Sequence, residues 1–236
     1  GESEKTFEEA IEAYNKLLDL YPLHMTGNIN LGLLYEELEE WDKASERYNV
    51  CIENKDETFY PYFNLATAYN AKGMYDEAEE ILEFYIKNYT DNAPIHLYLS
   101  WTYYCQGKYD LALVEADKAF SLAPTDYYNL IAKGDIYLYT EDFVKAEKEY
   151  QKLLESDEKA AQLNGRALLK ALYLMRGKFE ESEEQVKQGL ELAEKIGETG
   201  WEGGFHFFLG YSYLRTGNPE EALKEFDKIW SMAIEE

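Results

Sequence analysis

Three histidines and two cysteines are the side chains best suited to metal binding or nucleophilic catalysis in this sequence. His24, His96 and His206 lie far apart, and none has a second His or a Cys at the four-residue spacing that places two ligands on one helix face. Cys51 and Cys105 are too few for a cysteine-based zinc site. We therefore expect each His to be an isolated packing or surface residue, each Cys to be an inert thiol, and no metal or cofactor to be bound.

Two further features imitate functional motifs. Residues 197–203 read Gly-Glu-Thr-Gly-Trp-Glu-Gly, but no strand precedes them, no Lys-Ser or Lys-Thr follows, and two Glu would repel a phosphate. We predict a flexible loop from Gly197 to Gly204 instead. The Glu clusters within residues 36–40 and 180–184 are interpreted as solvated helix ends rather than acids or metal ligands. No convergent catalytic group remains, so the sequence predicts a protein without enzymatic activity.

The charge balance restricts the partners. The 236 residues are 46% hydrophobic and carry 23 Lys and Arg against 47 Asp and Glu, a formal charge of -24. Such a surface repels phosphate backbones and anionic lipids, so we expect neither nucleic acid nor a membrane as a partner. No apolar run has the length of a membrane span, and the first residues are acidic and polar. A cytoplasmic location is the expectation, with a removed targeting segment left open because the sequence begins with Gly.

The organisation of the chain is periodic. Tyr35, Tyr69, Tyr103 and Tyr137 are separated by 34 residues each, and Tyr173 and Tyr213 continue the series. The residue three before each Tyr is small in five of six copies: Gly32, Ala66, Ser100, Gly134, Lys170 and Gly210. The residue nine after each Tyr is Ala44, Ala78, Ala112, Ala146, Ser182 or Ala222. Such a repeat indicates stacked supersecondary units.

The spacing of apolar residues within one copy predicts two helices. In residues 59–92, Phe63, Ala66 and Tyr69, and then Ala78, Ile81, Leu82 and Tyr85, follow the three-and-four spacing of amphipathic helices. The break lies at Lys72-Gly73-Met74, where Gly permits a tight helix end. Equivalent turns fall at Gly107, Gly177 and Gly217, while Glu39 and Glu141 replace Gly in two copies. An all-α chain is predicted.

The pattern resembles the tetratricopeptide repeat (TPR). The family signature is matched by Leu31-Gly32, Tyr35, Ala44 and Tyr48 in the first complete copy, and by Leu209-Gly210, Tyr213, Ala222 and Phe226 in the last. The resemblance implies a single array, a right-handed superhelical solenoid of antiparallel helix pairs, with a half repeat at 1–24 and repeats at 25–58, 59–92, 93–126, 127–160, 163–202 and 203–236. The fifth complete copy is the least typical: Ala161-Gln162 precede it, and its longer second helix is expected to end near Ile196.

The resemblance also implies where a partner would bind. In the family, the first helix of each pair lines a concave face. Carried over to this sequence, the candidate peptide groove comprises Tyr60, Phe63, Asn64, Thr67, Asn70, Leu97, Trp101, Tyr104, Tyr128, Asp135, Tyr139, Phe207 and Tyr211. Among all the first-helix positions that line the concave face in the family, Arg215 is the only basic residue in this sequence. The Lys- and Arg-rich clamp with which some family members hold an acidic chain end is therefore not expected.

Two functions remain open at this point. The first is a protein–protein interaction scaffold, within a larger multidomain protein, that binds a peptide through apolar anchors and basic flanks. In that case the aromatic residues form a groove rather than packing between repeats. The alternative is a self-assembly module without a peptide groove, because the last helix, with Phe226, Ile229 and Trp230, is expected to leave apolar surface at the array end.

Overall fold

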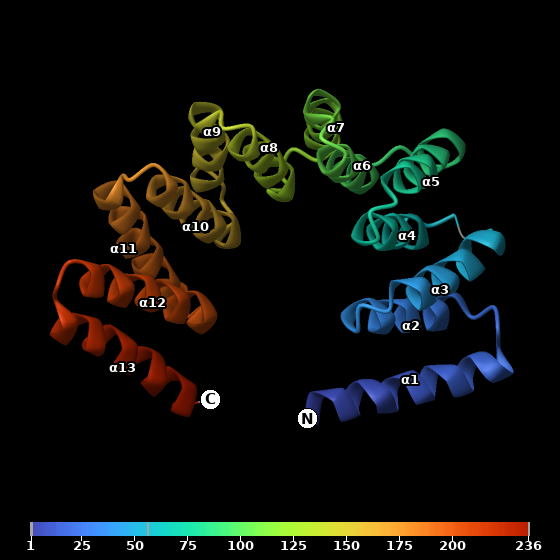
Figure 1. The fold of residues 1–236 in the computed structure, drawn as a ribbon, viewed down its shortest axis with the longest axis horizontal. Helices are drawn as coiled ribbons and strands as arrows, with labels where there is room; N and C mark the ends of the chain where they lie inside the picture. Colours follow the sequence, from blue (N-terminus) through green and yellow to red (C-terminus); the bar gives the residue numbers. More distant parts are fainter. Residues whose placement is uncertain (1, 56, 236) are drawn as a thin grey trace. The chain divides into compact units, whose positions relative to one another are not determined.

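The computed structural model describes residues 2–55 and 57–235, and all regular secondary structure in this part of the chain is helical (Figure 1). The helices are α1 (Glu2–Leu20), α2 (Met25–Glu37), α3 (Trp41–Glu53), α4 (Tyr60–Ala71), α5 (Tyr75–Asn88), α6 (Ala93–Cys105), α7 (Tyr109–Leu122), α8 (Tyr128–Tyr139), α9 (Phe143–Leu154), α10 (Lys159–Met175), α11 (Phe179–Ile196), α12 (Thr199–Arg215) and α13 (Pro219–Glu235). The predicted all-α helix-pair architecture is confirmed.

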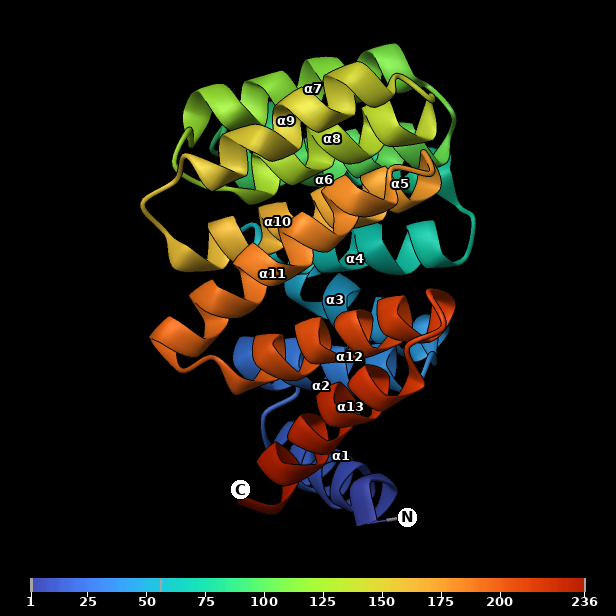
Figure 2. The same cartoon turned by 90° about the vertical axis from the view of Figure 1, so that its left-hand side faces the viewer.

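The chain divides into two compact units, Gly1–Pro124 and Thr125–Glu236. In the first unit, α1 packs against α2, and the hairpins α2–α3, α4–α5 and α6–α7 follow one another. The first helices of these hairpins also contact each other in the order α2, α4, α6. The second unit contains the hairpins α8–α9, α10–α11 and α12–α13, whose helices pack in sequence order (Figure 2).

The repeated tyrosine sits at the end of the first helix of each pair and helps to close the turn. Its carbonyl accepts the backbone N–H of the residue five positions later, as in Met74 to Tyr69 (2.9 Å) and Glu40 to Tyr35 (2.8 Å). This bond requires a left-handed residue between the helices. Gly73 supplies it at a φ of 74°, and Glu39 adopts a φ of 57° in a copy without Gly. The predicted turns are therefore confirmed.

Each unit contains a core in which side chains of successive helices meet, within a pair and between neighbouring pairs. In the first unit Ala44, Tyr48 and Leu65 form one buried cluster. In the second unit Leu163, Val186 and other apolar residues form another. The small residue before each tyrosine makes this packing possible, because a Cβ added at Gly32 would overlap the ring of Tyr48.

The predicted loop from Gly197 to Gly204 is wrong. Only Gly197 and Glu198 separate α11 from α12, with Gly197 in the left-handed conformation at a φ of 73°. The glycines of residues 199–204 remain helical because Trp201 and Phe205 pack against the core of the second unit. That burial outweighs the poor helix propensity of Gly.

The two inserted residues of the fifth copy do not form a linker. They belong to α10, and Ala161 is fully buried, so the insertion lengthens the first helix of that pair at its start. Its second helix, α11, ends at Ile196 as predicted.

Candidate functional site

The aromatic candidates of the first unit lie on α4 and α6, two helices that contact each other. Phe63 stacks on Tyr98 with ring centroids 4.5 Å apart, and Trp101 stacks on Tyr104 at 5.1 Å. Trp101 is 53% exposed and Tyr60 is 50% exposed, so neither is sealed between hairpins. Phe63, Leu97 and Tyr104 are half-buried. This part of the candidate site is an accessible aromatic surface, which we call the α4–α6 aromatic surface.

The polar candidates of the first unit are less accessible. Asn64 and Asn70 are buried. The Asn70 side-chain amide donates to the Thr102 hydroxyl (2.9 Å) and so joins α4 to α6, while its carbonyl oxygen is buried and has no partner among the described residues. The half-buried Thr67 donates its hydroxyl to the carbonyl of Phe63 (2.9 Å). These three residues therefore belong to the packing beneath the aromatic surface more than to its exposed part.

The candidates of the second unit divide in the same way. Tyr128, Tyr139, Phe207 and Tyr211 are all exposed. Asp135 is half-buried and accepts a hydrogen bond from the Tyr150 hydroxyl (2.6 Å). Burial raises the pKa of Asp135, although the bond from Tyr150 opposes the rise. Asp135 thus links the two helices of its pair, α8 and α9, and the four aromatic side chains are exposed on the surface.

At two residues beside the aromatic surface the structure differs from the sequence prediction. Tyr98 was missed because it lies one position away from those carried over from the family, yet it stacks on Phe63. Glu36 was interpreted as part of a solvated cluster, but it is half-buried, and one of its carboxylate oxygens has no hydrogen-bond partner in the part of the chain that the structure describes. Burial raises the pKa of Glu36 to about 7, with the Tyr48 hydroxyl opposing and the Glu37 charge adding to the rise. Burial and the Glu36 charge also raise the pKa of Tyr98.

The prediction of isolated histidines is wrong for two of the three. His96 is buried, with Nδ1 2.5 Å from Glu115 and Nε2 2.5 Å from Asp91. The bond to Glu115, more than that to Asp91, raises the pKa of His96 against the opposing effect of burial. His206 is likewise buried, and its Nδ1 lies 2.5 Å from Glu225. Each His is 19 residues before its Glu, a separation longer than a single helix, so helix-face spacing alone did not reveal the pairs.

Both cysteines are at least partly buried. Cys51 is buried, and burial raises the pKa of the half-buried Cys105. Within the described residues, no three His, Cys, Asp or Glu side chains gather as a metal ion would require. Among the described helices, none combines the length and apolar character needed to cross a membrane.

Comparisons with known families agree with the periodic sequence. Three models described as tetratricopeptide repeat match the chain, one at residues 3–52 and 63–127, a second at 127–159 and a third at 203–227. None of the curated proteins matches the sequence.

Several solved structures have a similar fold at low sequence identity. Human IFIT1 in a dimer with m7Gppp-AAAA has a TM-score of 0.65 at 16% identity, over 93% of this chain and 57% of that one. The APC/C hetero-tetramer Cut9-Hcn1 has a TM-score of 0.61 at 17% identity, over 98% of this chain and 44% of that one. The thermophilic TPR protein TTC0263 of Thermus thermophilus has a TM-score of 0.59 at 20% identity, over 71% of this chain and 92% of that one. The chain thus spans about half the length of the first two. At these identities the likeness concerns the fold.

Proposed function

Because the chain belongs to the tetratricopeptide-repeat family, we propose that it is a protein-interaction scaffold that holds a peptide segment of a partner on its inner aromatic surface. The observation that carries the proposal is the half-exposed state of Trp101 and Tyr60 on first helices that contact one another. Large aromatic side chains that are supported from below and open above concentrate binding energy at protein interfaces. The array serves a larger multidomain protein in this proposal.

The chemistry of the surface selects the partner. Stacked rings of the α4–α6 aromatic surface favour apolar or aromatic anchors in the bound segment. The net charge of -24 favours Lys or Arg beside those anchors, since opposite charge increases the rate of encounter and suppresses acidic competitors. The preferred ligand is therefore a peptide with apolar anchors and basic flanks.

RNA is a less favourable partner for this chain. IFIT1 was solved with m7Gppp-AAAA, but RNA binding depends on positive charge that neutralises phosphates. An excess of 24 negative charges opposes such contacts. A protein segment with basic flanks meets no such barrier.

The test is selection of peptides from a displayed random library on the purified chain, followed by affinity measurements with the selected peptides. Trp101→Ala is expected to weaken their binding by about 2 kcal/mol, roughly thirtyfold, because a central aromatic anchor is lost. Tyr104→Ala is expected to have a smaller effect in the same direction, since its ring supports Trp101.

A matched control is Phe84→Ala, which removes an exposed aromatic ring from α5, a second helix of the same unit. This variant is expected to bind the selected peptides as the parent does. If Trp101→Ala and the parent bind the peptides equally, and circular dichroism shows that both are folded, the α4–α6 aromatic surface is not the peptide-binding site.

A specific observation favours self-association as a second candidate. On α13, Trp230 is 71% exposed and Leu223 is 60% exposed, which leaves an apolar strip on the last helix. If this strip pairs with another copy, light scattering detects a mass that increases with concentration, and Trp230→Glu abolishes the increase. A constant monomer mass at high concentration rules out this candidate.

A further inference from the structure

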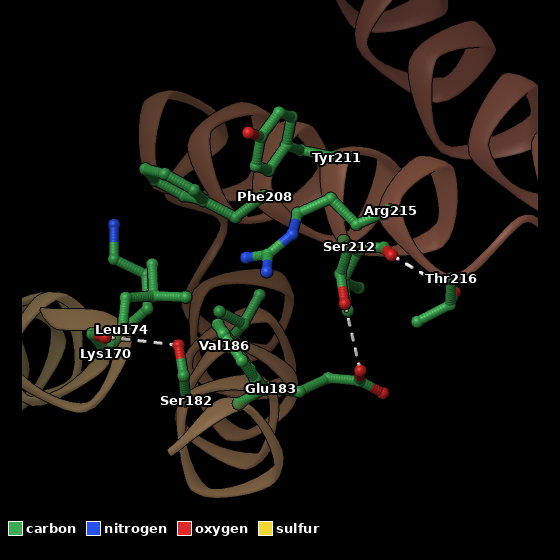
Figure 3. Close-up of a pocket in the computed structure, with 12 residues that line it drawn as sticks. Lys170, Leu174, Ser182, Glu183, Val186, Phe208, Tyr211, Ser212, Arg215 and Thr216 are labelled. Atoms are coloured by element: carbon green, nitrogen blue, oxygen red, sulfur yellow. Dashed lines mark hydrogen bonds between the residues drawn. The ribbon is translucent and has the colours of Figure 1, made fainter. Parts of the chain in front are cut away.

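A pocket of about 160 Å³ lies in the second unit, where α12 meets the α10–α11 hairpin (Figure 3). Its wall is largely apolar and includes Leu174, Val186 and Phe208, and its polar groups include Lys170 and Arg215. A cavity of about 150 Å³ accommodates a ligand of the size of benzene. The pocket therefore has room for a small apolar group together with one polar head.

The pocket arises from two departures from the repeat pattern. Lys170 stands where the other copies have Gly, Ala or Ser, as at Gly32. Val186 stands where copies with Gly place a large ring, such as Tyr48 opposite Gly32. In the fifth copy the ring between the two helices is absent, and a long cationic side chain enters from the other helix. The presence of Lys170 and Val186 at these two positions places an ammonium group between the helices of the repeat.

Lys170 is unusually buried for a lysine, with 7% of its surface exposed. Its Nζ lies 3.0 Å from the centroid of the Phe208 ring, and Figure 3 shows the side chain extending toward that ring. Among the described residues no carboxylate or hydrogen-bond acceptor contacts the ammonium; the bond drawn to Ser182 is accepted by the Lys170 backbone carbonyl (3.1 Å). Burial lowers the pKa of Lys170 to about 8.

Arg215 provides a second cation on the same pocket. Its guanidinium lies over the Phe179 ring at 4.3 Å and has no carboxylate partner among the described residues. The one carboxylate of the lining, Glu183, is already engaged by Lys187 (2.6 Å) and the Ser212 hydroxyl (3.0 Å). Several other cations of this unit have a carboxylate partner, as Lys152 has Glu149 (2.6 Å). The pocket thus has one buried cation, Lys170, and one exposed cation, Arg215, each against an aromatic ring and without a carboxylate partner among the described residues.

We propose that this pocket binds a carboxylate borne on a short branched apolar group, with Lys170 and Arg215 holding the carboxylate and Val186 and Leu174 contacting the apolar part. A carboxylate suits the site because charge-assisted bonds from an ammonium and a guanidinium offset the cost of burying Lys170. A free short-chain carboxylic acid and the terminal residue of a polypeptide both present this group. The site belongs to the second unit and shares no residue with the α4–α6 aromatic surface of the first, so it does not depend on the function proposed above.

The experiment follows the methyl resonances of Val186 and Leu174 by NMR in the whole chain during titration. The probes are 4-methylpentanoate and the tripeptide acetyl-Ala-Ala-Leu with a free carboxylate, each beside its neutral amide. Saturable shifts with at least one acid and not with its amide are the expected result. A response to the free acid alone identifies a small-molecule site, and a response to the tripeptide alone identifies a chain-end site. Shifts with neither acid, or equal shifts with acid and amide, overturn the proposal.

Two variants assign the binding to the two cations. Lys170→Met and Arg215→Gln are each expected to weaken binding of the responding acid tenfold or more. Lys148→Met, which removes an exposed charge from α9 in the same unit, is expected to bind as the parent does. Loss of binding in Lys148→Met equal to that in Lys170→Met overturns the site, because general attraction to positive charge then explains the result. Trp101→Ala retains the response, which separates this site from the peptide surface.

The pH dependence supplies a readout that belongs to Lys170. Only the ammonium form attracts a carboxylate, so binding is expected to weaken severalfold as pH rises from 7 to 9 through the pKa of about 8. The other titratable groups of the lining are Glu183, Tyr211 and Arg215. Lys170→Met removes the decrease between pH 7 and 9. The same decrease in Lys170→Met shows that another group controls binding and overturns the role given to Lys170.

Discussion

A pair of side chains facing each other between the two helices of a copy sets how closely those helices pack. The residue three before the repeated Tyr and the residue thirteen after it form these pairs: Gly32 with Tyr48, Ala66 with Leu82, Ser100 with Ala116, Gly134 with Tyr150, Lys170 with Val186, and Gly210 with Phe226. In five of the six pairs a larger residue on the first helix accompanies a smaller one on the second, and Lys170 with Val186 departs from this trend. Close packing requires this balance, because the interior tolerates neither a void nor an added atom.

The balance is testable at Gly32. A Cβ there would overlap the Tyr48 ring, so Gly32→Ala is expected to lower the free energy of unfolding by about 1 to 3 kcal/mol. Tyr48→Leu, which recreates the Ala66 and Leu82 combination, is expected to cost less in the Gly32→Ala background than in the parent. Urea unfolding of the four chains measures this coupling. Gly204→Ala, with open space around the added Cβ, is the control. Additive effects at Gly32 and Tyr48 contradict the balance.

The His96 pair gives a pH-dependent contribution to stability. Because Glu115 and Asp91 raise the pKa of His96 above its ordinary value of 6.5, the folded state binds the imidazole proton more tightly than the unfolded chain does. This contribution is fully present below pH 6.5 and is lost as pH rises through the folded pKa. The difference in unfolding free energy between the parent and His96→Gln is therefore expected to decrease from pH 6 to pH 9.

Urea unfolding at a series of pH values checks the His96 prediction, and the imidazole resonances of His96 report its titration directly. The groups facing the ring are Asp91 and Glu115, with Lys118 paired to Glu115 (2.8 Å). A difference between parent and variant that stays constant over this range contradicts the prediction.

At the scale of the element, α12 shows how packing overrides local preference. Gly200, Gly203 and Gly204 all lie in a helix, although none has a neighbour within 4 Å of its Cβ position. These glycines do not serve a close approach. The helix extends through them because Trp201 stacks on Phe205 (5.8 Å) and both join the core of the second unit.

Alanine at these glycines is therefore expected to stabilise the fold. Gly200→Ala and Gly203→Ala are each expected to raise the free energy of unfolding by about 0.5 to 1 kcal/mol, because Ala loses less backbone entropy in a helix. Gly73→Ala is the matched control in the opposite direction, since its φ of 74° is strained for Ala despite open space. Thermal and urea unfolding measure all three. Destabilisation by Gly203→Ala indicates that residues 199–204 are not helical in solution.

At the scale of the whole molecule, the net charge of -24 governs how a partner approaches. If the partner segment has basic flanks, its affinity is expected to fall severalfold between 20 and 200 mM salt, because the Debye length shortens to about 10 Å near 0.1 M. Isothermal titration with a selected peptide and its flank-neutralised version tests this. Only the peptide with basic flanks is expected to lose affinity as the salt concentration rises. Equal salt dependence of the two peptides contradicts a role for the acidic surface.

The sequence by itself determined the repeat, the helical class and the turns, because the spacing of Tyr, Gly and Ala is a local property repeated along the chain. It also indicated the exposed aromatics, since their positions follow from the first-helix register of the resembling family. Only the tertiary structure decided the rest. It buried Asn64 and Asn70, brought Glu115 to His96 and Glu225 to His206, and made residues 199–204 helical. It also showed that Lys170, which departs from the repeat pattern, lines a pocket together with Arg215. These outcomes depend on which side chains from different helices meet and what volume they leave, and spacing along one helix does not encode that.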